Sequence, residues 1–177
     1  MSTNDEIFYE VLTSVVKNFK KTIESIDNNK IQLSKKIINI KELIYHKIIK
    51  LKCSDSLEKL SKYGSINLNE FGDIRLIDIK ESDSDIINNQ ISVFDNCYKN
   101  NSLNIANLNN NLEEYIDDNF KYSSNLIMQC KEKYNNSLNS IDLKNCLSNA
   151  LKLSLKNYQF NINKLNMEVD SIQNQII

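Results

Sequence analysis

Apolar residues recur at intervals of three and four along the first third of the chain. They occupy positions 7, 8, 11, 12, 15, 16, 19, 23 and 26, and the stripe resumes at 33, 37, 40, 44, 48 and 51. This spacing predicts an amphipathic helix. The polar residues 27–30 interrupt the stripe without Gly or Pro, so one long helix and a helical hairpin both remain open. We expect a helical arm over residues 4–63.

The period changes after this arm. Gly64 stands where a left-handed residue often ends a helix, and a connector over residues 64–84 follows. Within it, apolar residues at 66, 68, 74 and 76 alternate with polar ones on either side of residues 70–73. Alternation predicts two short strands, although an ordered irregular loop near 65–80 fits almost as well. A lone hairpin is marginal in water, so we expect it to rest on the helix ends.

Helical spacing returns in a second arm over residues 85–134 and in a C-terminal helix over residues 141–176. Ser82 or Ser84 is suited to cap the second arm, and Ser140 the last helix. The asparagine-rich runs 99–102 and 109–111 are candidate breaks in the second arm. Apolar residues of the last helix follow a nearly heptad order, at 147, 151, 158, 162, 165, 169, 172 and 176.

These patterns predict an all-α protein with a short irregular or β-hairpin-like insert near 65–80. Short connections make neighbouring helices antiparallel, so we expect an antiparallel bundle or elongated coiled coil of three to four long helices. At 177 residues the chain is long enough for one domain with its own core, and we expect residues 1–177 to form a single helical domain.

Charge is unevenly distributed although the net charge is −1. Residues 1–64 carry 12 Lys against 8 acidic residues, residues 65–120 carry 3 basic against 11 acidic residues, and residues 121–177 carry 7 Lys against 4 acidic residues. A basic arm is typical of nucleic-acid binding. Proteins that read nucleic acids specifically use arginine to bind phosphates and base edges, however, and Arg75 is the one arginine in the sequence. We therefore expect no nucleic-acid partner, and basic and acidic arms that lie side by side.

No stretch approaches the roughly 20 apolar residues that cross a bilayer, so we expect no membrane span. The acidic start, residues 1–6, lacks the basic and apolar regions of a signal peptide. Taken literally, the sequence predicts a cytoplasmic protein. The alternative is a secreted protein, if Met1 is not native and the cysteines are paired.

Four cysteines fall on the apolar stripes, at Cys53, Cys97, Cys130 and Cys146. Their wide spacing does not suit a zinc site. Cys130 and Cys146 are equidistant from residue 138, and Cys53 and Cys97 are equidistant from residue 75, so antiparallel hairpins would place each pair at one level. Two interpretations remain open: disulfides 53–97 and 130–146, or four reduced cysteines packed as small apolar side chains.

Glu113, Glu114, Asp117 and Asp118 form two i, i+4 carboxylate pairs in the second arm. Like charges at this spacing weaken a helix slightly, which favours either an acidic contact face or an ordinary solvated face. The single histidine, His46, lies off the main stripe, and no nucleophile can be tied to it from the sequence. We expect no catalytic residues, no metal site and no cofactor.

A chain of long heptad-like helices without a catalytic constellation is typical of scaffolds and complex subunits. We therefore expect a non-enzymatic structural or interaction protein that binds a protein partner, or itself as a homo-oligomer, through its apolar stripes. The alternative function is a secreted, disulfide-stapled helical protein that carries or encloses a small apolar ligand.

Overall fold

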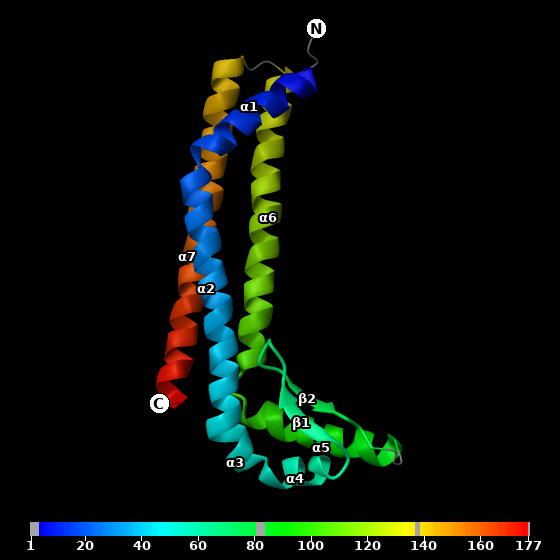
Figure 1. The fold of residues 1–177 in the computed structure, drawn as a ribbon. Coiled ribbons are helices and arrows are strands. Elements are labelled where there is room, and N and C mark those ends of the chain that lie inside the picture. Colours follow the sequence, from blue (N-terminus) through cyan, green and yellow to red (C-terminus); the bar gives the residue numbers. More distant parts are fainter. Residues whose placement is uncertain (1–3, 81–83, 137–138, 177) are drawn as a thin grey trace. The chain divides into compact units, whose positions relative to one another are not determined.

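A computed structural model describes residues 4–80, 84–136 and 139–176 of the chain. Long helices dominate it, and a β-hairpin interrupts their order (Figure 1). The elements are α1 (Asn4–Asn18), α2 (Lys20–Ile44), the π-helix η1 (Tyr45–Ile49), α3 (Lys50–Lys52), α4 (Ser54–Ser61), β1 (Ser65–Leu68), β2 (Ile74–Ile77), α5 (Ser84–Asn101), α6 (Ile105–Asn136) and α7 (Ser140–Ile176). The predicted fold class is confirmed: all-α with a hairpin insert.

The chain divides into two compact units. Unit 1 comprises Met1–Gln32 and Asn111–Leu165, and unit 2 comprises Leu33–Asn110 and Asn166–Ile177. Unit 1 therefore holds α1 with parts of α2, α6 and α7. Unit 2 holds the elements from η1 to α5, with the remaining parts of those three helices.

The first arm is a series of helices rather than one. A turn at Phe19 separates α1 from α2, and α2 then continues through residues 27–30 without a break. Ile26 and Leu33 are both buried and lie two turns apart, so the apolar stripe stays in phase across the polar residues. The arm ends at Ser61, slightly before the expected end at residue 63.

The connector forms a two-stranded antiparallel hairpin. Ile66 pairs with Leu76 and Leu68 with Ile74, and these four side chains are the half-buried face of the hairpin. Three of them line a cavity of about 90 Å³ together with side chains of α4 and α5: Ile66, Ile74 and Leu76, with Leu60 of α4 and Ile91 and Phe94 of α5. The hairpin therefore rests on α4 and α5, as the sequence predicts for so short a sheet.

The structure requires glycine at positions 64 and 72 for two different reasons, and neither is the helix cap that we expected at Gly64. Gly64 does not adopt the left-handed conformation predicted for it. A Cβ at this position would lie 2.6 Å from the Ile77 carbonyl oxygen, so only glycine lets the backbone at residue 64 come this close to β2. Gly72 in the hairpin turn has φ +76°, which glycine adopts without strain. The helix end is therefore shaped by packing against β2 rather than by a glycine cap.

A break divides the second arm into α5 and α6. Leu103 and Asn104 have φ of 54° and 60°, and the Ile105 N–H bonds to the Ser102 carbonyl oxygen at 3.2 Å. The break begins at the end of the first predicted site, residues 99–102, whose first three residues remain helical. Asn104 tolerates the left-handed region that the break requires. The second, residues 109–111, remains helical. Helix α5 begins at Ser84, and the other predicted cap, Ser82, lies outside the described residues.

Helices α6 and α7 are antiparallel neighbours. Asn139, not the predicted Ser140, caps α7: its Oδ1 accepts a hydrogen bond from the Asp142 N–H at 2.9 Å. Because Ser140 already lies within the helix, the preceding asparagine is the residue placed to accept from the first turn.

Candidate functional site

The Cys53–Cys97 pair lies in unit 2, where the first arm bends. The π-helix η1 and the short α3 lead to Cys53, whose φ of −112° and ψ of 23° are not helical. The Cys53 N–H still bonds to the Ile49 carbonyl oxygen at 2.8 Å, so the bend remains hydrogen-bonded. The sulfur atoms of Cys53 and Cys97 are 1.98 Å apart, which joins the start of α4 to the last third of α5.

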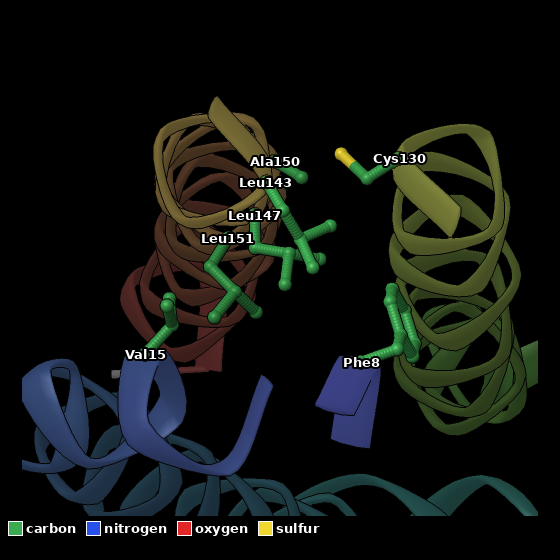
Figure 2. Close-up of a cluster of buried hydrophobic side chains, with 7 residues drawn as sticks. All are labelled: Phe8, Val15, Cys130, Leu143, Leu147, Ala150 and Leu151. Carbon is green, nitrogen blue, oxygen red and sulfur yellow. The ribbon is translucent and has the colours of Figure 1, made fainter. Parts of the chain in front are cut away.

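The Cys130–Cys146 pair lies in unit 1, between α6 and α7. Its sulfur atoms are 2.12 Å apart and its Cα atoms 5.8 Å apart. Figure 2 shows the Cys130 sulfur pointing from α6 toward α7. The buried apolar cluster around it draws on three helices, with Phe8 and Val15 of α1, Cys130 of α6, and Leu143, Leu147, Ala150 and Leu151 of α7.

The two pairs at bonding distance are the two pairs that the hairpin register of the sequence predicts. Each joins antiparallel helices that are close along the chain, with sequence separations of 44 and 16. Among the residues that the structure describes, no group of His, Cys, Asp and Glu side chains is arranged to hold a metal ion. The arrangement of the sulfurs suits covalent staples.

Lys131 of α6 covers the outer edge of the unit 1 core. Its Nζ lies 5.6 Å from the centroid of the Phe8 ring and 5.4 Å from that of Tyr9, and 3.5 Å from Asp5 Oδ1. Cations are attracted to the faces of aromatic rings. This lysine therefore helps to fix the orientation of α1 on α6 within unit 1.

The predicted acidic face is exposed on α6. Glu113, Glu114, Asp117 and Asp118 all face solvent. None of them forms an ion pair within the described part of the chain. The four carboxylates stay close together on one helix, and the structure leaves them available to groups outside the chain.

A buried lysine fixes the tip of the hairpin. The Lys41 side chain is 8% exposed, and its Nζ donates to Asp73 Oδ1 at 2.9 Å and to the Phe71 carbonyl oxygen at 3.4 Å. Asn69 Oδ1 accepts from the backbone N–H groups of Phe71 and Asp73, each at 2.9 Å. These bonds hold the turn in one shape, with the Phe71 ring 54% exposed at its tip.

Three tyrosines have a raised pKa. Burial raises the pKa of Tyr45. Burial and the negative charge of Asp73 raise the pKa of Tyr98, and burial and Asp27 raise that of Tyr158. Each phenol is therefore held in its neutral form more firmly than in water, which suits packing rather than proton transfer at neutral pH.

An apolar groove runs along unit 1 where α1 meets α2. Its floor is formed by Leu12, Val16 and Ile23, its rim carries Lys17 and Lys20, and its volume is about 520 Å³. The groove is open to solvent along its length. Its size falls within the range of small-molecule ligand sites.

The single histidine, His46, lies at the surface of unit 2. His46 is exposed on η1, and its ring meets the Tyr45 ring edge-on with centroids 5.1 Å apart. Within the described ranges, no helix is long and apolar enough to cross a membrane.

Sequence reasoning missed two features. The Lys41–Asp73 pair joins residues 32 positions apart, and nothing in the local pattern connects them. Leu153 and Phe160, on α7, are 53% and 66% exposed although the main stripe of that helix is buried from Leu147 to Val169. Their spacing of seven residues, off the main stripe, was the available signal for a second apolar face.

Comparison of the chain with models of protein families, with curated proteins and with solved structures found no match, so its function is argued from its own geometry.

Proposed function

We propose that this protein is a non-enzymatic binding protein of an oxidising compartment, whose stapled helices present a fixed surface to a macromolecular partner. The observation that carries the proposal is the placement of all four cysteines in two pairs, one in each unit. Disulfides persist in oxidising compartments and are rare in the cytosol, so we prefer this location to the cytoplasmic one.

Exposed apolar side chains support a binding role. Phe71, Phe120 and Phe160 are 54%, 72% and 66% exposed. Aromatic side chains of this kind commonly become the anchors of a protein interface, because they bury a large area at a small cost in side-chain entropy. The hydrogen-bonded turn that carries Phe71 is ordered before binding, which reduces that cost further.

The compartment is tested by the intact mass of the protein from its native source, after alkylation without reduction. We expect no alkylated cysteine, and peptide mapping should recover the linked peptides 53–97 and 130–146. Four alkylated cysteines would refute the oxidising compartment and favour a cytoplasmic location instead.

The binding role is tested by photo-crosslinking in native extract. A benzophenone side chain at Phe160 should yield a discrete adduct, and the same group at the exposed Lys59 serves as the matched control. Adducts of equal yield at both positions, or none at either, would contradict a surface specific to the aromatic residues.

A second candidate function is transport of a small apolar ligand. The groove over Leu12, Val16 and Ile23 favours it, because its lining is mostly apolar. A carrier should bind an apolar fluorescent probe in a fixed ratio while fully folded, and Val16→Lys should abolish that binding. If the folded protein leaves the probe unbound, the partner-binding function stands alone.

A further inference from the structure

One face of α7 in unit 1 combines exposed apolar and basic side chains. Leu153 and Phe160 lie two turns apart and therefore on one side of the helix, and the exposed lysines Lys156 and Lys164 fall beside them. No acidic residue occurs between Asp142 and Glu168. We call Leu153, Lys156, Phe160 and Lys164 the basic face.

One face of α6 in the same unit has the opposite charge. Glu113, Asp117 and Phe120 are spaced by four and three residues, so they share one side of the helix. Phe120 is 72% exposed. We call these three residues the acidic face; Glu114 and Asp118 extend its charge along the neighbouring strip.

The two faces do not meet inside the chain. Helices α6 and α7 contact each other through residues outside these faces. The Ser154 hydroxyl of α7 lies 3.3 Å from Asn119 Oδ1 of α6, and Cys130 is joined to Cys146. Both phenylalanines remain exposed, and within the described residues no ion pair involves a charged member of either face. The molecule thus carries two unused surfaces of opposite charge, each with an exposed phenylalanine.

We propose that the partner is a second copy of this chain, whose acidic face packs on the basic face of the first. The inference rests on the proposed binding function and names its partner. Phe120 of one copy would pack against Leu153 and Phe160 of the other, which shields apolar area on both sides. Lys156 and Lys164 lie about 6 Å along the helix on either side of Phe160. The carboxylates of the acidic face all precede Phe120, so the lysine on that side of the contact comes within their reach.

Complementary charge is the reason to prefer this occupant. Opposite charges at the rim steer the encounter and disfavour the wrong orientation, although each exposed pair adds little affinity by itself. Because two different faces meet, the contact is heterologous, and it can extend from one copy to the next unless the geometry closes. The association should weaken as salt is added, since exposed charges are screened.

The test is a charge exchange followed by sedimentation. One variant carries Lys156→Glu and Lys164→Glu, and the other carries Glu113→Lys and Asp117→Lys. Each should weaken self-association at least about 10-fold, because like charges then face each other. An equimolar mixture of the two should associate again, since the exchanged residues of one variant then face exchanged residues of opposite sign on the other. The control variant carries Lys59→Glu and Lys62→Glu, at the end of α4. It changes the net charge by the same amount as the first variant and should associate as the unchanged chain does.

Two results would overturn the proposal. The unchanged chain could remain monomeric up to about 500 micromolar, a range that covers weak interfaces of small area. Binding of that monomer to vesicles of phosphatidylcholine and phosphatidylserine would then assign the basic face to a membrane surface. Finally, both charge variants could associate as the unchanged chain does. Each of these leaves the disulfide and crosslinking tests of the proposed function intact, so the two failures are distinguishable.

Discussion

Removal of either disulfide should lower the free energy of unfolding by several kcal/mol. A crosslink reduces the conformational entropy of the unfolded chain by an amount that grows with the loop it closes. The separation of 44 residues between Cys53 and Cys97 corresponds to about 4 kcal/mol, and the separation of 16 between Cys130 and Cys146 to about 3 kcal/mol. Each pair has one buried and one half-buried cysteine, so the packing lost on substitution is similar in both.

The assay is urea denaturation of two double variants, Cys53→Ala with Cys97→Ala and Cys130→Ala with Cys146→Ala, followed by circular dichroism. Both should unfold at lower urea than the oxidised parent, and the first should lose about 1 kcal/mol more than the second. Hydrogen exchange should place the first effect in unit 2 and the second in unit 1, since each bridge lies within one unit. Losses below about 1 kcal/mol in both variants would refute the reasoning, because a bridge with no effect does not constrain the unfolded chain.

Three further predictions concern single side chains. Lys41→Ala should lower the protection of the hairpin amides against hydrogen exchange by about 1 kcal/mol, because its partner Asp73 is half exposed; unchanged protection would contradict the role of the lysine. Leu147→Ala should lower the free energy of unfolding, measured by urea denaturation, by about 3 kcal/mol, and Leu153→Ala should lower it by less than about 0.5 kcal/mol, because only Leu147 is buried. Equal losses in the two variants would refute this. The raised pKa of Tyr98 means that the folded protein binds the phenol proton more tightly than the unfolded chain does, so this contribution to stability is present below pH about 10 and is lost as the pH rises through the raised pKa. Tyr98→Phe should therefore reduce the loss of stability at alkaline pH. Equal slopes of unfolding free energy against pH in the variant and the parent would disprove this.

Local pattern was sufficient for the class of the long helices and of the two strands. Intervals of three and four predicted the helices, and the alternation at Ile66, Leu68, Ile74 and Leu76 predicted the strands, because side chains repeat with those periods in each structure. The cysteine register followed from the same logic: residues equidistant from a tight connection lie at one level of an antiparallel hairpin.

Exact ends and breaks were less predictable, because several residues of similar propensity compete for each position. Ser140 and Asn139 are both good caps, and both asparagine runs in the second arm tolerate a break. The structure uses Asn139 and breaks the arm at Leu103 and Asn104. Tertiary packing decides between residues of similar propensity, and the local sequence carries no information about that packing.

The sequence by itself determined that this protein is helical, that a hairpin interrupts the helices and which cysteines can meet, because each of these follows from periodicity and distance along the chain. Tertiary structure alone decided that Lys41 reaches Asp73, that Gly64 lies against Ile77, and that Phe120 and Phe160 stay exposed. Those features depend on which elements lie against each other in space, and residues far apart in the chain carry no local signal of their contact.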